Sequence, residues 1–485
     1  MPIHPTLIKR IKCFLIKPLK ILFNKSIQLG IVPHDWKIAN VTPTYKNNRK
    51  PFNVESYRPI CQTSPICKIF ERIIRSKITL YLDEHGVITP EQHGFTKGRS
   101  TTTNLLSTLN DWTKAIDEKF NVDALYIDLA KAFDSVVHSK LLYKLSLLGL
   151  GGNLLKWFEM YLTGRSQQVK VNKAVTMPSE VISGIPQGTI LGPFLFNIYI
   201  NDLPSKTNSC KVTLYADDAK MYKTISNEDD FQAFSQDIVN VEDFFNDWQL
   251  NVNQNKCELL HLGHDNPKNN YEINGSSIPD KPIIRDLGVL LDEKLLCRNH
   301  ISAIVRTAYF RLKQFNNTFE CREMEFLVFM FTTYIRPILE SNTQVWSPYQ
   351  IGDIDTIERV QRRFTKSVLG LHNKEYVERL QILGLSSLEC RRIYFDLILL
   401  YKMCNNLIDI DFESLFQFNR STTRGHKYKI MVKHARLNTR KFFFCNRVVP
   451  IWNNLPDNIV EAQSLALFKS KLGNFNLDVY CKGRT

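Results

Sequence analysis

The chain has 485 residues, 44% of them hydrophobic and 11% aromatic, which is typical of a globular protein with more than one core. Its 63 lysines and arginines against 48 aspartates and glutamates give a formal net charge of +15. This charge favours polyanionic partners such as nucleic acid, although membrane-surface and heparin-binding proteins share it. The eleven cysteines contain no C-x-x-C pair, which indicates reduced thiols and excludes a zinc module.

The first apolar and basic stretch is LIKRIKCFLIKPLKILF, residues 7–23. Lysines recur through it and no small-residue cleavage site follows, so it predicts an amphipathic helix rather than a targeting segment. No apolar run reaches the roughly twenty residues of a transmembrane helix. The sequence therefore predicts an intracellular protein of the nucleus or cytoplasm that is not secreted and not bound to a membrane.

Three successive patterns follow along the chain. Residues 1–100 mix helical patterns, such as CKIFERIIRSKITLYLDEHG, with loops rich in Lys, Pro and Asn. Residues 120–295 alternate strand-like runs with helical stretches, and from about Ile301 the pattern turns helical. The chain is therefore expected to have an α+β body followed by a helical C-terminal region.

The motif YADD places two adjacent carboxylates, Asp217 and Asp218, between two short runs of strand formers. A third carboxylate, Asp128, ends the strand-like run ALYI. If YADD forms the turn of a hairpin, its carboxylates project from the tip, and Asp128 on a neighbouring strand completes a cage for two divalent metal ions. An adjacent Asp pair is also typical of a solvated turn, so this motif alone leaves both interpretations open.

Further motifs resemble one family when they are taken together. In chain order they are ESYRPICQTSPICKIFERII, EQHGFTKGRSTTTNLL, LYIDLAKAFDSVVH, SGIPQGTILGPFLFNIYINDLP, TLYADDAKMY, LNVNQNKCELLHLG and IRDLGVLLDEKL. They resemble the reverse transcriptase of non-LTR (LINE-type) retrotransposons, especially the jockey-like group. The resemblance continues into YIRPILESNTQVWSPYQ and VVPIWNNLPDNIV, and so covers essentially the whole chain.

The resemblance implies a right-hand polymerase with fingers, palm and thumb and a helical C-terminal region. The expected parts are an N-terminal extension and fingers at 1–120, a palm with interleaved finger segments at 121–295, a helical thumb at 296–375 and a helical, basic region at 376–485. The family's endonuclease, which precedes the fingers, is expected to be missing here, as in a truncated copy.

The implied activity is RNA-directed DNA polymerisation, in which deoxynucleoside triphosphates extend a DNA primer on an RNA template. Asp128, Asp217 and Asp218 would bind two Mg²⁺ ions, with the backbone carbonyl of Leu129 contributing and Mn²⁺ as a possible substitute. Lys256 matches the family's lysine that approaches the leaving pyrophosphate, where a cation or acid aids departure.

Other matched residues are expected to contact the nucleotide. Gln187 and Gly188 stand at the start of a predicted helix near the incoming nucleotide and template base. Arg58 and Arg99 match basic finger residues that meet the triphosphate or template, for which a guanidinium is suited. Phe133 stands five positions beyond Asp128 and would exclude a ribose 2′-hydroxyl.

Two further features leave alternatives open. The stretch RGHKYKIMVKHARLNTRKFFFCNR, residues 424–447, holds eight Lys or Arg and no acid, and suits either RNA binding or a solvated basic face. A catalytically inactive RNA-binding scaffold and an RNA-dependent RNA polymerase remain alternative functions. Retention of all three carboxylates argues against the first, and Phe133 argues against the second.

Overall fold

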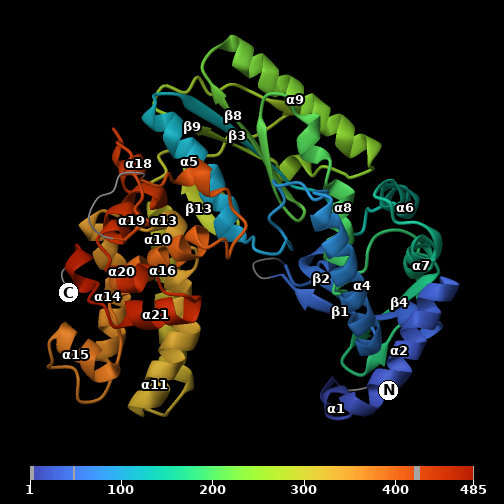
Figure 1. The fold of residues 1–485 in the computed structure, drawn as a ribbon, viewed down its shortest axis with the longest axis horizontal. Helices are drawn as coiled ribbons and strands as arrows, with labels where there is room; N and C mark the ends of the chain where they lie inside the picture. Colours follow the sequence, from blue (N-terminus) through green and yellow to red (C-terminus); the bar gives the residue numbers. More distant parts are fainter. Residues whose placement is uncertain (1–4, 47–49, 420–425, 484–485) are drawn as a thin grey trace.

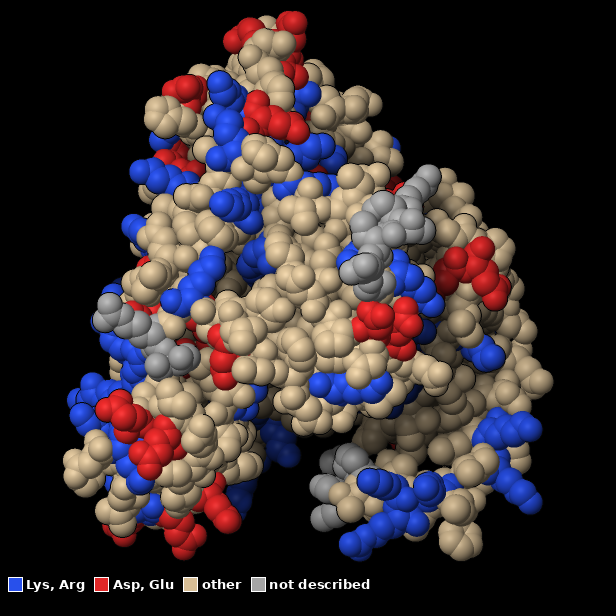
Figure 2. Space-filling model, turned by 60° about the vertical axis from the view of Figure 1, so that its left-hand side comes forward, with Lys and Arg blue, Asp and Glu red and all other residues tan. Residues whose placement is uncertain are grey.

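The structure is a computed structural model that describes residues 5–46, 50–419 and 426–483. Its N-terminal and C-terminal elements form two groups, joined by a central sheet at the top of the view (Figure 1). The space-filling view shows a hollow between the two groups that opens at the lower edge (Figure 2). No helix within the described ranges is long and apolar enough to cross a bilayer.

The central sheet consists of four antiparallel strands in the order β7, β8, β3, β9. Their bounds are Lys211–Tyr215 for β7, Asp218–Ile225 for β8, Asn121–Ile127 for β3 and Glu258–Leu262 for β9. In the register of β3 with β8, Ile127 pairs with Ala219. The end of β3, where Asp128 follows, therefore lies beside the start of β8.

Alternate residues of β3 enter two different cores, as the two-residue period of a strand requires. Val122 and Ala124 belong to the core that extends into the C-terminal region, whereas Leu125 and Ile127 belong to the N-terminal core. Helix α5 packs on the first side of the sheet, and helices α8 and α9 contribute to the second core. These helices span Thr101–Asp117, Leu191–Ile200 and Glu228–Asp247.

Local capping explains where two of these helices begin. Ser100 and Thr103 form a reciprocal capping box at the start of α5. The Asn227 side chain accepts from the Asp230 N–H at the start of α9, whose first turn is acidic and so suits the positive end of the helix dipole.

A second sheet lies among the N-terminal elements. Its strand order is β2, β1, β4, β5, with β6 also paired to β4, and β1 runs parallel to β4. The bounds are Ile38–Tyr45 for β1, Tyr57–Gln62 for β2, Arg165–Val171 for β4, Ala174–Val175 for β5 and Ser179–Val181 for β6. In this sheet, β1 from the first 50 residues thus pairs with β4, which lies beyond residue 160.

Helices near this sheet pack through aromatic rings. The Phe23 and Phe70 rings stack with centroids 4.4 Å apart, and the Trp157 ring lies edge-on to Phe70. The helices and short turns of this part are α1 Pro5–Arg10, α2 Lys12–Leu29, α3 His34–Lys37, η1 Val54–Ser56, α4 Pro65–Glu84, α6 His138–Leu147, α7 Gly152–Leu162 and η2 Leu203–Lys206.

A hairpin links the central sheet to the helices that follow. Strands β12, Ile283–Asp286, and β13, Val289–Asp292, join through Leu287 and Gly288, both of which have positive φ. Helix α10, Arg298–Thr318, then packs against α14, Ile351–Lys366. The region between β8 and this hairpin also contains η3 Gln254–Lys256, β10 Glu272–Ile273 and β11 Ser276–Ser277.

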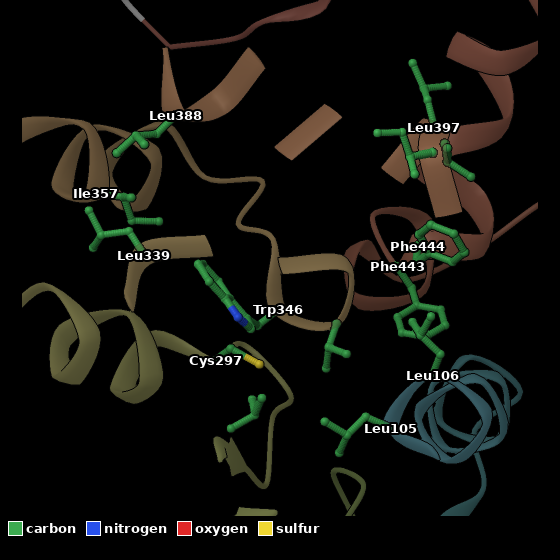
Figure 3. Close-up of a cluster of buried hydrophobic side chains, with 14 of the residues drawn as sticks. Leu105, Leu106, Cys297, Leu339, Trp346, Ile357, Leu388, Leu397, Phe443 and Phe444 are labelled. Carbon is green, nitrogen blue, oxygen red and sulfur yellow. The ribbon is translucent and has the colours of Figure 1, made fainter. Parts of the chain in front are cut away.

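The C-terminal region is helical and packs against α5. Figure 3 shows Leu105 and Leu106 of α5 close to Phe443 and below Phe444 in one buried cluster. The remaining elements are α11 Met324–Met330, η4 Phe331–Ile335, α12 Arg336–Glu340, α13 Thr343–Trp346, α15 Tyr376–Leu383, α16 Leu388–Cys404, α17 Phe412–Leu415, α18 Asn438–Lys441, α19 Phe444–Asn453, α20 Asp457–Val460, α21 Leu465–Gly473 and η5 Asp478–Tyr480.

The expected α+β body with a helical C-terminal region is confirmed. The four expected domain boundaries stay a prediction. Helix α5, which the sequence places with the fingers, shares a core with the C-terminal helices.

Candidate active site

The YADD motif forms the tight turn of hairpin β7–β8. Tyr215 pairs with Asp218, so only Ala216 and Asp217 form the loop. Ala216 has a φ of +58°, in the left-handed region that side chains other than Gly seldom adopt. The turn therefore places Asp217 at its tip and Asp218 at the first position of β8.

The EQHG segment, residues 91–94, holds this strained turn in place. The Gln92 side-chain oxygen Oε1 accepts from the backbone N–H of Ala216 at 2.9 Å and from that of Gly94 at 2.7 Å. The His93 N–H donates to the Leu214 carbonyl at 2.9 Å. A Cβ at position 94 would lie 2.2 Å from the Ala216 nitrogen, so the approach requires glycine.

Asp128 lies directly after β3, on the strand next to β8. Its backbone carbonyl accepts from the Asn253 N–H at 2.7 Å, and its carboxylate forms an ion pair with Lys256 Nζ at 2.8 Å. Both side chains of the ion pair are partly exposed. Leu129, which follows, forms a backbone bridge with Val252, and its side chain is buried.

Electrostatic repulsion links the three carboxylates. Burial is the largest cause of the raised pKa of Asp217, and the Asp128 charge raises it further while Arg58 lowers it. Burial also raises the pKa of Asp218 to about 6, with added repulsion from Asp217 and smaller contributions from Asp286 and Asp128. A divalent cation would relieve this repulsion, and oxygen-only donors suit a hard cation.

The carboxylates do not converge on one point in this conformation. Across the described ranges, no group of three or more His, Cys, Asp or Glu side chains has the arrangement of a metal site. Lys256 supplies the positive charge at Asp128 instead. The donor set therefore fits a divalent cation chemically, provided that Asp128 exchanges its ion pair for the metal.

A buried ion pair lies two residues beyond Asp218 on strand β8. Lys220 Nζ is 2.7 Å from Asp286 of β12, and both side chains are about 95% buried. Lys220 also donates to the Asn104 side chain of α5 at 3.2 Å, and the Tyr126 hydroxyl donates to Asp286 at 3.0 Å. This network joins β8, β3, α5 and the β12–β13 hairpin through one buried cation.

Gln187 and Gly188 lie before α8, as predicted. The Gln187 carbonyl accepts from the Cys61 N–H of β2 at 2.8 Å, and its side chain donates to Asp134 at 3.3 Å. Gly188 has a φ of +104°, and a Cβ there would lie 2.6 Å from the Cys61 carbonyl oxygen. The two residues thus join strand β2 to the start of α8.

Glu71 of α4 caps the helix that follows this corner. Its buried carboxylate accepts from the backbone N–H groups of Ile190 and Leu191 at 2.7 and 3.2 Å. These are donors of the first turn of α8, which a carboxylate satisfies while it also interacts favourably with the helix dipole. Glu71 thereby fixes the corner that contains Gln187.

Phe133 and Arg58 occupy different positions around the site. The Phe133 ring is partly buried and stacks on Phe196 of α8, with centroids 4.7 Å apart. Arg58 is exposed on β2 and lies near enough to Asp217 to lower its pKa. Their roles toward a nucleotide stay predictions.

Arg99 takes a structural position. Its guanidinium pairs with Asp409 at 2.7 Å and donates to the backbone carbonyls of Gln92 and Pro90. Its side chain is only 12% exposed. These contacts favour a role in holding the segment that carries Gln92, so the expected contact of Arg99 with the triphosphate or template stays an unsupported prediction.

The basic C-terminal stretch is divided between structure and surface, and its first two residues, Arg424 and Gly425, lie outside the described residues. Arg440 donates to the Asn110 carbonyl and the Thr113 hydroxyl of α5 at 3.2 and 3.0 Å, and Arg447 pairs with Asp396 at 2.8 Å. Phe443 and Phe444 are buried. The interpretation of this stretch as a solvated basic face therefore holds for only part of it.

Comparison with known proteins decides the family. The family model described as reverse transcriptase (RNA-dependent DNA polymerase) matches residues 45–329, more than half of the chain. The chain belongs to the reverse transcriptase family. The fold is accordingly that of a right-hand polymerase, in which the sheet with the three carboxylates is the palm.

Among similar proteins, the probable RNA-directed DNA polymerase from transposon BS of Drosophila melanogaster is 25% identical over 364 residues, covering 72% of this chain and 40% of that protein. The RNA-directed DNA polymerase from mobile element jockey of the same species is 28% identical over 295 residues, covering 59% and 32%. The resemblance to jockey-like non-LTR elements is confirmed. The chain spans about two fifths or less of the length of these relatives.

Among solved structures, a telomerase from Candida albicans in complex with the TWJ fragment of telomeric RNA has a TM-score of 0.42 at 11% identity, covering 74% of this reverse transcriptase and 66% of the telomerase. This likeness is too weak to support an inference about the site.

Sequence reasoning missed the groups that position the YADD turn. Gln92 stood inside a motif that carried the resemblance, yet its contact with Ala216 spans 124 residues. Lys220 offered a clearer signal, because a lysine within the apolar strand AKMY needs a buried partner. Glu71 likewise interrupts the apolar face of α4.

Proposed function

We propose that this chain is an RNA-directed DNA polymerase that extends a DNA primer with deoxynucleotides on an RNA template during retrotransposition. The supporting observation is the hairpin turn that presents Asp217 and Asp218 beside the strand end at Asp128. Phosphoryl transfer requires little covalent chemistry from the protein, so catalysis depends on metal ions and on positioning. A turn held by Gln92 provides such positioning.

Asp128 and Asp217 would be the main ligands of the metal, with Asp218 and the Leu129 carbonyl beside them. Two Mg²⁺ ions, or Mn²⁺ in their place, would stabilise charge on the attacking 3′-oxygen and the leaving phosphates. The ion pair of Asp128 with Lys256 gives the lysine a second role. If Asp128 held the metal instead, the ammonium of Lys256 would be free to act near the leaving pyrophosphate.

On the nucleotide side, Gln187 and Gly188 would lie along the base pair, and exposed Arg58 would meet the triphosphate. Phe133 would lie beneath the sugar, where its stacking on Phe196 holds the ring in one orientation. A ring excludes a 2′-hydroxyl by volume and offers it no hydrogen-bond partner.

The deciding experiment is primer extension on an RNA template with deoxynucleotides and Mg²⁺. The parent chain should extend the primer, and Asp217→Asn and Asp218→Asn should each lose at least about a hundredfold in rate, because a neutral amide binds the cation weakly. Asp243→Asn, at an exposed position of α9, is the matched control and should extend like the parent. RNA binding by a parent that shows no extension would support the inactive scaffold instead.

Sugar selection provides an independent test. Phe133→Val should keep measurable deoxynucleotide extension and raise ribonucleotide incorporation by about tenfold or more, since the space under the sugar opens. A parent that prefers ribonucleotides would favour the RNA polymerase alternative. Unchanged discrimination in the variant would show that Phe133 is only a core residue.

A further inference from the structure

Two partly exposed cysteines lie against each other in the C-terminal region, where the proposed polymerase mechanism uses neither. Cys390 belongs to the first turn of α16, and Cys481 directly follows the short turn η5. Both thiols are free. The Cys481 side chain forms a hydrogen bond with that of Cys390, and this contact raises the pKa of Cys481 well above its usual range, with burial and the charges of Glu389 and Asp478 adding to it.

Backbone hydrogen bonds place the segment that carries Cys481 at the start of α16. The Glu389 carboxylate accepts from the Lys482 N–H at 2.9 Å and from the Gly483 N–H at 2.8 Å. Glu389 directly precedes Cys390, and Lys482 directly follows Cys481. The fold itself therefore brings the two thiols together.

The helix before Cys481 is also packed on α16. Helices α16 and α21 contact each other, and both belong to the C-terminal group in Figure 1. The Tyr401 ring of α16 stacks on Phe468 of α21 with centroids 4.2 Å apart, and the Tyr401 hydroxyl donates to the Ala462 carbonyl at 2.6 Å. The chain after α21 thus returns to the beginning of a helix on which α21 already rests.

A pocket of about 470 Å³ opens beside Cys390. Cys390 lines it together with parts of α15, the turn before α16, the end of α21 and residues 475–478. A small oxidant can therefore reach the Cys390 thiol from solvent. The thiols of Cys67 and Cys445, in contrast, lie within the two hydrophobic cores.

We propose that Cys390 and Cys481 form a reversible disulfide when the chain meets a low-molecular-weight disulfide such as oxidised glutathione. Disulfides of intracellular proteins are usually transient and redox-sensing, so the pair would stay reduced until such an oxidant accumulates. The bond would close a loop of about 90 residues. It would fix the segment after α21 to the start of α16.

Two exchange steps form the bond. The Cys390 thiol loses its proton to solvent and attacks one sulfur of the oxidant, whose S–S bond breaks. One half of the oxidant leaves as a thiolate and takes up a proton, and the other half remains on Cys390 as a mixed disulfide. Cys481 then loses its proton, attacks the Cys390 sulfur and releases the second thiolate. Two protein thiols are oxidised, and one small disulfide is reduced to two thiols.

The surroundings set the order of these steps. Cys390 lines the pocket and meets the oxidant first. The pKa of Cys481 is raised by its contact with the Cys390 thiol, by burial and by two carboxylates, so Cys481 is a poor first nucleophile. Conversion of Cys390 to the mixed disulfide removes the first of these causes, which favours attack by Cys481 in the second step.

The test oxidises the full chain with glutathione disulfide, blocks free thiols by alkylation and digests the product with trypsin without reduction. Cleavage after Lys and Arg releases residues 380–391 and 472–482, each with a single cysteine. Mass spectrometry should find these two peptides joined, and dithiothreitol should separate them. At micromolar chain, this link should exceed links through the exposed Cys13 or Cys321 by about tenfold or more, because it forms within one folded chain. Unlinked peptides, or equal linkage of all these cysteines, would overturn the proposal.

Single substitutions test the assigned order. Cys481→Ser should stop at the first step and keep glutathione on Cys390, whereas Cys390→Ser should leave Cys481 largely unmodified. The exposed Cys321→Ser is the matched control and should form the linked pair like the parent. Glutathione on Cys481 of the Cys390→Ser variant, with none on Cys390 of the Cys481→Ser variant, would overturn the order.

Unfolding the chain distinguishes a property of the fold from general thiol reactivity. In concentrated urea, linkage of the two peptides should fall to the level of other cysteine pairs. Linkage that persists unchanged in urea would show that the fold does not direct it, and would overturn the proposal. The readout is a covalent bond in the parent chain, so it does not depend on whether the chain extends a primer.

Discussion

The palm and the C-terminal region each bury a cationic side chain, but the two side chains differ in their hydrogen-bond partners. Lys220 in the palm has a carboxylate at 2.7 Å and an amide oxygen at 3.2 Å. Arg392 in the C-terminal region lies near three carboxylates, yet its two Nη atoms have no hydrogen-bond partner in the described part of the chain. The donors of Lys220 are satisfied by direct contacts, whereas Arg392 has its charge balanced by nearby carboxylates without hydrogen bonds to its Nη atoms among the described residues.

This difference separates fixed from adaptable parts of the molecule. Around the YADD turn, buried groups such as Gln92 and Lys220 contact several segments at once, which restricts the movement of the turn. Around Arg392, the charge is balanced at a distance by three carboxylates and not by direct hydrogen bonds to its Nη atoms within the described residues. A site for chemistry needs the first arrangement, because its side chains must be held in one geometry.

Breaking the palm pair should have the largest effect. Lys220→Met leaves Asp286 buried without its cation, so the free energy of unfolding should fall by about 3–5 kcal/mol. Urea denaturation followed by circular dichroism measures this. The double variant Lys220→Met, Asp286→Leu should recover most of the loss, and a double variant that is less stable than the single one would show that the pair itself stabilises the palm.

Removing the Gln92 side-chain oxygen that holds the YADD turn should have the next largest effect. Gln92→Leu leaves the Ala216 and Gly94 N–H groups without their acceptor, which should lower the free energy of unfolding by about 2–4 kcal/mol. Primer extension should also require more Mg²⁺, because Asp217 is no longer fixed. The exposed Gln381→Leu serves as the control for both measurements. An unchanged Mg²⁺ requirement would limit Gln92 to stability alone.

Acid should weaken the same region by a smaller amount. Burial lowers the pKa of His93 to about 3, with Arg99 and Lys220 lowering it further and Asp409 opposing them. The unfolded chain binds a proton here near pH 6.5 and the folded chain does not, so stability is complete above that pH and falls below it.

At pH 5.5 the contribution of His93 to this loss should be about 1.4 kcal/mol relative to pH 7.5. Denaturant midpoints of the parent and of His93→Gln at the two pH values isolate it, since other titrating groups are common to both. If both proteins lose the same stability on acidification, His93 is not the group responsible.

Among these substitutions, the smallest effect on the free energy of unfolding is expected at Arg392. Arg392→Met should lower the free energy of unfolding by about 1–2 kcal/mol, less than Lys220→Met, because the carboxylates near Arg392 keep hydrogen-bond donors of their own. The same urea series measures it. A loss as large as that of Lys220→Met would show that the two cations are equivalent and would remove the distinction drawn between the regions.

The sequence predicted the local features of the site well. YADD forms the hairpin turn that the sequence offered as one interpretation, but only Asp217 lies in the turn, whereas Asp218 begins β8. The helix after Gln187 and Gly188 was also found where the motif indicated. Each depends on neighbouring residues or on a family pattern that can be read along the chain.

Contacts between distant segments were not predictable in the same way. Arg99 was assigned to the nucleotide on a family pattern, but its partner Asp409 lies 310 residues away and no local signal indicates it. The hydrogen bond from the Ala216 N–H to Gln92 and the ion pair of Lys220 with Asp286 likewise depend on how distant segments of the chain fold together. Periodicity and motif spacing carry no information about such partners.

The position of α5 has a consequence for synthesis of the chain. This helix ends at Asp117, but α13, one of the C-terminal helices that pack against it, begins at Thr343, about 230 residues later. At about 5–20 residues per second, the ribosome needs roughly 10–45 seconds to synthesise the chain between the end of α5 and the start of α13. During this interval Leu105 and Leu106 lack their final neighbours, so the nascent chain is a substrate for chaperones that bind apolar segments.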